Sequence, residues 1–585
     1  DDGKVKGDPD QITITPDTKQ GGLRFNWLTD PRVTKTVIQY KVKGASKWES
    51  KSGTSYVESV TAGYKEKAAH RVEITGLTPS AEYVYRVGDG GEFMSEEKSF
   101  TAPKSADDKN FKVIFYSDPQ SESVENYMSF KYSIDQALKV CPNPDLMISA
   151  GDTTQNGYKS TEWEACFEVM HDYYAKYPTV TVAGNHEMKG DWNFISFAQR
   201  FNMSGAKTGY PEFDRTMGYF EYGDAIFVIL NGEVTPADKK PEIMKKELQW
   251  CKSVLDASDK KWRIVMTHAG PYTSNHDPLD VRDYYINDSE YSLDKMNVDL
   301  FLNGHDHIYI RSTVKNDIKV NTGDGTTYIT GGTVGNKFYE YIPARSDYST
   351  DFYVDEEDKQ VFSVIEFSED SIKGTAYQKQ DPDDWNSFKA VDSYEILNNL
   401  QTGKQVSDYT DVSKNAWYYD AAKYVTDKQL MSGEKPYVFG ADEALTRAEV
   451  ASALYNLAGQ PKVELASFTD VPVTHQARTA IAWAAKTGIM KGVGDNKFEP
   501  DRSVSREEIA TLLTRQRKLS GEDVSADKAA INEFADSAKI SSWAVDGVAY
   551  CTKSGLVKGN PGKVFAPAGN TTRAELATII QRIAA

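Results

Sequence analysis

The sequence of 585 residues lacks any apolar run near the 18 residues that a membrane-spanning helix needs, and its mean hydropathy is −0.57. It also lacks concentrated positive charge: its longest basic clusters are pairs such as Lys239-Lys240. A protein that holds nucleic acid needs a basic face. Here 86 acidic residues outnumber 68 basic ones, which gives a formal net charge of −18. These absences argue against a transmembrane segment and against a nucleic-acid scaffold.

Cysteine is scarce as well. The four cysteines show no CxxC spacing and are too few for a disulfide framework, so they leave the cellular compartment open. The chain begins Asp1-Asp2-Gly3-Lys4 without an initiator methionine. We therefore expect a mature secreted product at the cell surface whose signal peptide has been removed.

The length predicts about four domains, and the pattern of residues changes along the chain. In residues 1–104, short alternating runs separated by Gly, Pro and Asp predict an all-β sandwich, with strands at 23–28, 37–42 and 82–87. Residues 76–87 resemble the end of a fibronectin type III domain, in the version that precedes the catalytic domain of purple acid phosphatases.

In residues 105–385, apolar strands alternate with amphipathic helical stretches, which predicts an α/β domain. A polar cluster follows each of the expected strands at 112–116, 146–149, 180–182, 263–267 and 299–302. Ligands bind beyond the carboxyl ends of such strands, so we expect the clusters to converge on one site. The clusters are Asp118-Pro119-Gln120, Gly151-Asp152, Gly184-Asn185-His186-Glu187, His268 and Gly304-His305-Asp306-His307.

Carboxylate, imidazole and amide groups in these clusters suit two closely spaced divalent cations with one bridging carboxylate. The order of the motifs resembles the calcineurin-like metallophosphoesterase family over residues 111–378. The resemblance implies a sandwich of the αββα type that hydrolyses phosphate esters. It also implies that one metal is held by Asp118, Asp152 and His307, and the second by Asn185, His268, His305 and the bridging Asp152. His186 would be the acid or electrostatic helper beside the phosphate.

Two positions depart from the family pattern. Many members have a histidine where this chain has Gln120, and purple acid phosphatases have a tyrosine ligand where it has Gln155. Without that tyrosine, the purple iron(III) chemistry should be absent. An Asp-Pro-Gln variant is similar to one in other calcineurin-like phosphatases, so we predict that Gln120 coordinates and that Gln155 is the weaker alternative. The cofactors would be two ions of Mn, Fe, Zn or Mg, with an oxygen-rich first position.

The last 180 residues contain a threefold internal repeat. Each copy has a Thr/Ser-Arg-x-Glu tetrapeptide that predicts a capping box: Thr446 with Glu449, Ser505 with Glu508, and Thr572 with Glu575. The arginine inside each tetrapeptide falls at the first helical position, where the helix dipole favours an anion. Arg447, Arg506 and Arg573 therefore predict three pockets for a carboxylate or phosphate.

The repeats resemble S-layer homology domains, at residues 406–462, 463–525 and 526–585 after a linker at 386–405. That family binds pyruvylated secondary cell-wall polysaccharide. The resemblance implies that the three arginines contact the ketal carboxylate, helped by Gly433, Gly492 and Gly559. Asp411, Asp470 and Asp536 either bind sugar hydroxyls or cap the next helix. We expect Trp417, Trp483 and Trp543, as corresponding residues of the repeats, to lie in the core.

The sequence thus predicts a metal-dependent phosphomonoesterase or phosphodiesterase that is anchored to the cell wall. Asp152 and His186 are its expected catalytic residues. Two alternatives remain. One is an S-layer or adhesive protein whose phosphoesterase domain has lost activity, and the other is a nucleotidase or cyclic-nucleotide phosphodiesterase with the same metals.

Overall fold

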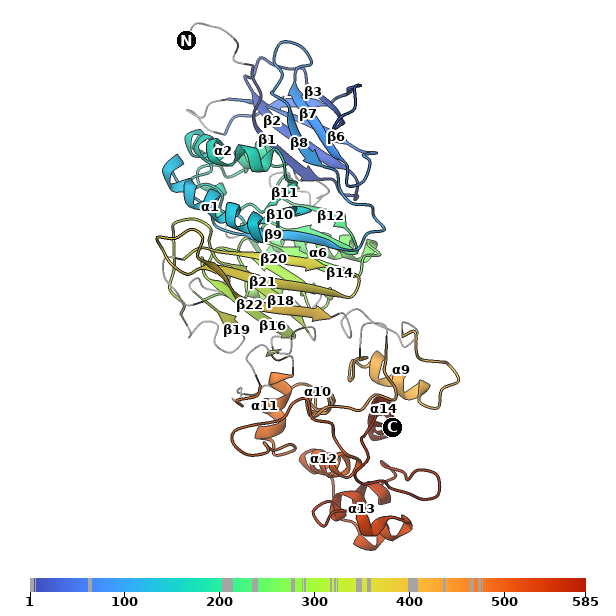
Figure 1. Cartoon of the computed structure of the whole chain (residues 1–585). Coiled ribbons are helices and arrows are strands. Elements are labelled where there is room, and N and C mark those ends of the chain that lie inside the picture. The colour runs from blue at the N-terminus through green and yellow to red at the C-terminus, as the bar shows by residue number, and fades with distance from the viewer. Residues whose placement is uncertain are drawn as a thin grey trace. The chain divides into compact units, whose positions relative to one another are not determined.

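The protein is described by a computed structural model that covers residues 5–584 with some gaps. The gaps are residues 6, 61–65, 203–213, 234–239, 275–278, 287, 289–290, 316–317, 320–321, 323–324, 343–349, 355–358, 398–408, 435–437, 462, 464–467, 472–474 and 476. The chain forms two compact units (Figure 1). One comprises residues 1–312 and 326–396, and the other comprises residues 313–325 and 397–585.

The first unit begins with a β-sandwich, as the sequence predicts. Its strands are β1 (Asp10–Pro16), β2 (Leu23–Thr29), β3 (Val37–Val42), β4 (Glu49–Ser52), β5 (Thr54–Val57), β6 (Ala68–Ile74), β7 (Glu82–Gly88) and β8 (Lys98–Thr101). They form two four-stranded sheets in the orders β1-β2-β6-β5 and β4-β3-β7-β8. Side chains that alternate inward along the strands, including Phe25, Tyr85 and Phe100, fill the space between the sheets.

A six-stranded sheet follows in the same unit. Its strands are β9 (Phe111–Tyr116), β10 (Leu146–Ser149), β11 (Thr179–Thr181), β20 (Val361–Phe367), β21 (Ser371–Lys379) and β22 (Phe388–Leu397), in the order β11-β10-β9-β20-β21-β22. Strands β9, β10 and β11 are parallel, and α1 (Val124–Val140) and α2 (Ser160–Tyr174) connect them. The parallel arrangement brings three carboxyl ends to one edge of the sheet.

The second large sheet has eight strands. They are β12 (Gly218–Tyr222), β13 (Ala225–Ile229), β14 (Trp262–Met266), β15 (Leu300–Asn303), β16 (Tyr309–Lys315), β17 (Ile318–Lys319), β18 (Thr326–Gly331) and β19 (Thr350–Tyr353). Strands β13, β14, β15 and β18 run parallel. Helices α6 (Lys240–Ala257) and α7 (Leu279–Tyr285) also belong to this half.

The two large sheets pack face to face. Phe115 and Ile148 of one sheet share a core with Phe227 and Met266 of the other, and all four side chains are fully buried. Helix α1 packs on β20 and α6 packs on β13, so helices cover the outer faces. The predicted αββα architecture is confirmed.

The C-terminal boundary of this domain differs from the expectation. Residues 388–397, which the sequence analysis places in a linker, form the edge strand β22. Arg311 and Asp392 are both buried and pair across the sandwich at 2.8 Å, with the Tyr309 hydroxyl donating to the same carboxylate. The linker prediction was therefore wrong over these residues. A ten-residue strand with alternating exposure is not distinguished by composition from a polar linker.

The second unit is helical. Its helices are α9 (Tyr419–Asp427), α10 (Arg447–Leu457), α11 (Arg478–Lys486), α12 (Arg506–Leu519), α13 (Val545–Lys553) and α14 (Arg573–Ala584), with 3-10 turns η3 (Lys528–Glu533) and η4 (Ser537–Lys539). Helix α10 packs on α11, α12 on α13, and α14 on α9. Each repeat thus packs its second helix on the first helix of the next repeat, and the last repeat closes on the first.

Hydrogen bonds confirm the capping boxes predicted for α10, α12 and α14. Among the helices that the structure describes, none combines the length and apolarity needed to cross a membrane.

Candidate metal centre

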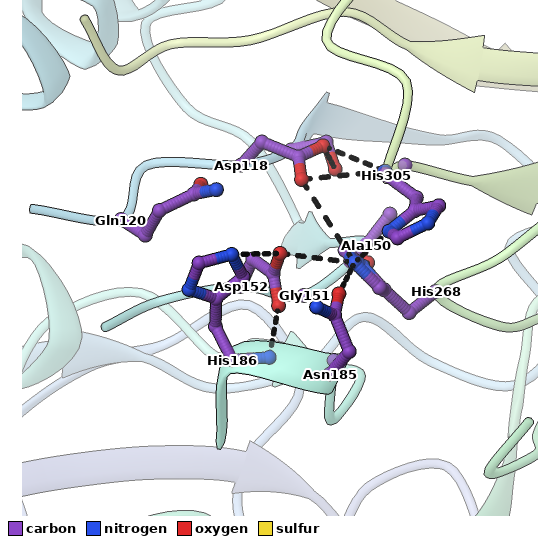
Figure 2. Close-up of polar contacts among 12 residues, drawn as sticks. Asp118, Gln120, Ala150, Gly151, Asp152, Asn185, His186, His268 and His305 are labelled. Atoms are coloured by element: carbon purple, nitrogen blue, oxygen red, sulfur yellow. Dashed lines mark hydrogen bonds and ion pairs between the residues drawn. The ribbon is translucent and has the colours of Figure 1, made fainter. Parts of the chain in front are cut away.

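The polar clusters converge at one edge of the α/β sandwich, as the sequence predicts. Asp118 follows β9, Asp152 follows β10, and His268 follows β14 (Figure 2). Asn185 and His186 open the short helix α3 (Asn185–Met188) after β11, and His305 and His307 follow β15. The face-to-face packing of two sheets brings these strand ends together.

Two groups of ligand atoms share one carboxylate. Asp118, Asp152 and His307 place ligand atoms within 4.8 Å of one another, and so do Asp152, His268 and His305. Asp152 Oδ2 lies 3.1 Å from His268 Nε2, and Asp118 Oδ1 lies 3.4 Å from His307 Nε2. This is the arrangement expected for two cations bridged by Asp152.

The histidines are held so that one nitrogen faces the centre. His268 Nδ1 lies 2.7 Å from the Ala150 carbonyl oxygen, and His307 Nδ1 lies 2.5 Å from the Lys337 carbonyl oxygen. A carbonyl can only accept, so both Nδ1 atoms donate and both Nε2 atoms keep a free lone pair. Backbone partners of this kind fix the tautomer and the ring orientation of metal-binding histidines.

The three amide residues near the centre differ in which of their atoms face it. The side-chain oxygen of Gln120 is buried and has no hydrogen-bond partner among the described residues, while its nitrogen lies 3.1 Å from His307 Nε2. Asn185 Oδ1 lies 3.2 Å from His268 Nε2. Gln155 contributes its backbone oxygen to His186. The donor set of the clusters, with an unpartnered buried oxygen at Gln120, fits two divalent cations.

Burial opposes the ionisation of Asp118 and Asp152, the two carboxylates of the cluster. Burial and the charge of Asp152 raise the pKa of Asp118 to about 7. Burial also opposes ionisation of Asp152, but the charges and hydrogen bond of the neighbouring histidines, His268 first, hold its pKa below its usual range. Such opposed shifts in one cluster are characteristic of functional sites.

Glycines make room for the ligands at two close approaches. A Cβ on Gly184 would lie 2.2 Å from Asp152 Oδ1, and a Cβ on Gly304 would lie 1.9 Å from Ser117 Oγ and 2.6 Å from Asp118 Oδ2. Any larger residue would therefore displace a carboxylate. The glycines that precede Asn185 and His305 in the motifs thus have a steric function.

Glu187 is a positioning residue to which the sequence analysis gives no function. Its fully buried carboxylate accepts hydrogen bonds from the backbone N–H groups of Asp152, Thr153, Thr154 and Gly184, at 2.7–3.0 Å. These bonds join the loop after β10 to the loop after β11. The sequence could have indicated Glu187 as a functional residue, because it directly follows His186 in the motif.

His186 lies beside Asp152, with its Nε2 atom 3.8 Å from Oδ2 (Figure 2). Its Nδ1 lies 2.7 Å from the Gln155 carbonyl oxygen and donates to it. The ammonium group of Lys189 lies 3.1 Å from Nε2. Burial, together with the charges of Lys189 and Lys337, lowers the pKa of His186 against the opposing effect of Asp152. Nε2 is thus the ring atom that can face a substrate.

Residues 111–309 match the family model of calcineurin-like phosphoesterases. The chain carries a calcineurin-like phosphoesterase domain. Residues 9–102 match the purple acid phosphatase N-terminal domain, and residues 408–451, 467–510 and 533–577 match the S-layer homology domain. All three resemblances found in the sequence are confirmed.

The similar proteins are of two kinds. Purple acid phosphatase 15 of Arabidopsis thaliana is 24% identical over 56% of this chain and 69% of its own length. Amylopullulanase of Thermoanaerobacterium thermosulfurigenes is 31% identical, but the match covers only 29% of this chain and 9% of that enzyme. The solved purple acid phosphatase PPD1 of yellow lupin (Lupinus luteus) shares the fold, with a TM-score of 0.53, 15% identity, and coverage of 67% and 74% of the two chains.

The arginines of the S-layer homology domains lie between repeats. Each donates to the backbone oxygen that precedes the loop glycine of the next repeat: Arg447 to Lys491, before Gly492, Arg506 to Lys558, before Gly559, and Arg573 to Ser432, before Gly433. Each arginine therefore lies beside the glycine-containing loop of another repeat.

Two of these arginines already have an anionic partner. Arg573 pairs with Glu449 at 2.5 Å, and Arg506 pairs with Glu575. The corresponding Glu508 is bonded instead to Arg502, at 2.8 and 3.2 Å. Arg447 consequently forms no ion pair within the described part of the chain. The three sites are thus chemically unequal.

The aspartates of the repeats have a common structural role. Asp411, Asp470 and Asp536 each accept two backbone N–H groups, from residues 439–440, 498–499 and 565–566 respectively. They therefore fix the loop that receives the arginine and do not cap the next helix. These bonds engage both oxygens of each carboxylate.

The tryptophan prediction was wrong for two residues. Trp417 and Trp543 directly precede Tyr418 and Ala544, the N-caps of α9 and α13, and are 68% and 56% exposed. Trp483 lies within α11 and is buried. The three are therefore not corresponding residues: Trp483 corresponds in its helix to Tyr424 of α9 and Tyr550 of α13. Counting tryptophans without the helix register caused the error.

Proposed function

We propose that the protein is a metal-dependent phosphohydrolase attached to the cell wall. The observation that carries the enzymatic part is the pair of ligand groups that share Asp152. The proposed ligands are Asp118, Gln120, Asp152 and His307 for one cation, and Asn185, Asp152, His268 and His305 for the other. Two cations bound there would activate water at neutral pH and neutralise charge on the phosphoryl group.

The protein residues have separate tasks in this proposal. Glu187 holds the loop of Asp152 in place, and the carbonyl groups of Ala150 and Lys337 orient His268 and His307. In its protonated form, His186 can donate a hydrogen bond or a proton from Nε2 to the leaving oxygen. In support of this, the His186 Nε2 atom lies 3.8 Å from Oδ2 of Asp152, the proposed bridging ligand.

The test is turnover of p-nitrophenyl phosphate and bis-p-nitrophenyl phosphate by protein reconstituted with Mn²⁺, Fe²⁺ or Zn²⁺. We expect activity on at least one substrate, and a loss of at least 100-fold in Asp152→Asn, which keeps the shape but removes the bridging charge. Activity no greater than that of Asp152→Asn with every metal would favour the alternative of a non-catalytic surface protein.

We also propose that the repeats attach the chain to a pyruvylated cell-wall polysaccharide. Arg447 is the strongest carboxylate site of the three, because its guanidinium has no carboxylate partner among the described residues. Arg506 and Arg573 would have to exchange Glu575 and Glu449 for the ligand. On this basis, we expect the site of Arg447 to bind a carboxylate ligand more strongly than the sites of Arg506 and Arg573.

Sedimentation with purified cell walls tests this ranking. We expect Arg447→Gln to weaken binding more than Arg506→Gln, and removal of the pyruvate groups to weaken binding of the unaltered protein. Equal binding to walls with and without pyruvate would refute a carboxylate pocket.

A further inference from the structure

The arginine sites of the three S-layer homology repeats are built alike. The backbone N–H of each arginine donates, at 2.8–3.0 Å, to the carbonyl of the residue that stands four positions before the arginine of another repeat. These pairs are Arg447 with Arg502, Arg506 with Gly569, and Arg573 with Glu443. Arg502, Gly569 and Glu443 are therefore corresponding residues, and each lies beside the site arginine of another repeat.

The capping-box glutamates of the repeats use their two oxygens for different partners. In all three repeats, Oε2 accepts the backbone N–H of the cap residue at 2.8–2.9 Å. Oε1 accepts from an arginine. For Glu449 and Glu575 this is the site arginine of another repeat, Arg573 and Arg506 respectively. Two of the three glutamates thus neutralise an arginine across a boundary between repeats.

Glu508, the third of these glutamates, departs from this arrangement because Arg502 holds it within its own repeat. Nη2 of Arg502 donates to Oε1 at 2.8 Å and Nη1 donates to Oε2 at 3.2 Å, while Nε lies 3.1 Å from Glu499 Oε2. A two-point bond between guanidinium and carboxylate is stronger and more specific in geometry than a single bond. Neither Gly569, which has no side chain, nor Glu443, which is acidic, can hold a glutamate in this way.

The site of Arg447 is left with one guanidinium nitrogen free. Its Nε and Nη2 atoms donate to the Phe498 and Lys491 carbonyls, at 2.8 and 2.7 Å, and Nη1 has no partner within the described part of the chain. In Arg506, whose Nε and Nη2 atoms make the equivalent bonds, Nη1 binds the Glu575 carboxylate. The free nitrogen of Arg447 is thus the atom that binds a carboxylate at the equivalent site.

We propose that Arg502 is a positioning residue that opens the site of Arg447 to an external carboxylate by withdrawing Glu508 from it. This rests on the proposed attachment to a pyruvylated polysaccharide. The carboxylate of the polysaccharide takes, at Arg447, the place that a glutamate of the chain itself occupies at the other two arginines. Arg502 acts through Glu508 and need not touch the ligand. A single residue of the second repeat thus decides which of the three sites is open.

Sedimentation with purified, pyruvylated cell walls tests this role on the full chain. Arg502→Gln should weaken binding by about fivefold or more, because Glu508 is released and pairs with Arg447. The double variant Arg502→Gln/Glu508→Gln should bind within about twofold of the unaltered protein, since the competing carboxylate is gone. Arg517→Gln, which removes an arginine paired with Glu522 in the same repeat, is the matched control and should not weaken binding. Unweakened binding by Arg502→Gln, or a double variant as weak as Arg502→Gln, would overturn the proposal.

Hydrogen exchange shows whether Glu508 turns to Arg447 without any wall ligand. The opening constants of α10 and α12 are compared for Arg447→Gln, Glu508→Gln and both together. In the unaltered background the two effects should multiply, and in the Arg502→Gln background they should depart from that product by about threefold or more. Independent effects in both backgrounds would overturn the proposal. Equal binding of the unaltered protein to walls with and without pyruvate would refute the carboxylate pocket, whereas this coupling would still decide the role of Arg502.

Discussion

Four of the proposed ligands adopt left-handed backbone conformations, which non-glycine residues rarely adopt. Asp118, Asp152, His305 and His307 have φ values of 53°, 53°, 75° and 54°. Each such residue costs about 1 kcal/mol or more, and strain of this kind is kept where the surrounding structure holds it in place for function. At this scale the sequence identifies the residue types, and the backbone supplies the direction in which they point.

Measurements of metal affinity can show whether Gln120 or Gln155 is the metal ligand. We expect Gln120→Ala to weaken the affinity for one cation by about 10- to 100-fold, because it removes the buried, unpartnered oxygen at the centre. Gln155→Ala should change it by less than about threefold, since the backbone oxygen of Gln155 holds His186 and survives the substitution. Metal titration followed by calorimetry measures both. The reverse order would make Gln155 the ligand.

His70 should make the sandwich sensitive to acid. It is buried between the hydroxyls of Thr29 and Thr36, at 2.7 Å from each, and burial lowers its pKa to about 4. The unfolded chain binds the proton at about pH 6.5, so it binds more protons than the folded chain between pH 6.5 and 4. The stabilising effect of a neutral His70 is thus complete above pH 6.5 and is lost as pH falls towards 4.

We expect this loss to reach about 2–3 kcal/mol in the free energy of unfolding. Urea unfolding of the full chain at several pH values, followed by a probe in the sandwich, measures it. His70→Gln should flatten the dependence between pH 6.5 and 4. A slope that is equally steep in His70→Gln would assign the acid sensitivity to other groups.

At the scale of elements, the centre depends on how closely loops approach one another. The loop after β15 passes so near Asp118 that only a glycine fits at position 304. The loops after β10 and β11 are joined through Glu187. These contacts connect segments that are distant in sequence, and they keep the parallel strand ends at a fixed separation.

Gly304→Ala should therefore remove the metal centre without removing a ligand. The added Cβ would lie 1.9 Å from Ser117 Oγ and 2.6 Å from Asp118 Oδ2, so Asp118 must move. We expect metal affinity to fall at least tenfold and stability to fall by about 1–3 kcal/mol. Calorimetry and thermal unfolding measure the two effects. Gly91→Ala, where a Cβ would approach no described atom closer than 3.7 Å, is the control.

At the scale of the whole molecule, the chain combines a catalytic unit with a closed set of repeats. The last helix of the repeats, α14, packs on the first, α9. Arg573 of the third repeat pairs with Glu449 of the first, and Arg506 of the second pairs with Glu575 of the third. The S-layer homology domains therefore depend on one another, although their sequences read as three separate copies.

Loss of one buried arginine should consequently destabilise more than one repeat. We expect Arg506→Ala to lower the local free energy of opening by about 2–4 kcal/mol, because it removes the ion pair of Glu575 and the guanidinium donor to the Lys558 and Phe565 carbonyls. Hydrogen exchange of the full chain should show faster exchange in both α12 and α14. Arg502→Ala, which removes a partly exposed pair, should cost less than about 1 kcal/mol. Faster exchange confined to α12 would contradict the closed arrangement.

The sequence by itself determined the three kinds of domain, the strands and the identity of the clustered residues. Strands such as 37–42 and 146–149 were correct because alternating or wholly apolar runs follow directly from burial. The tertiary structure alone decided that β22 completes the six-stranded sheet, that the arginines bridge repeats, and that Trp417 and Trp543 are exposed. Each of these depends on contacts between segments far apart in the chain, whose pairing no local pattern of residues specifies.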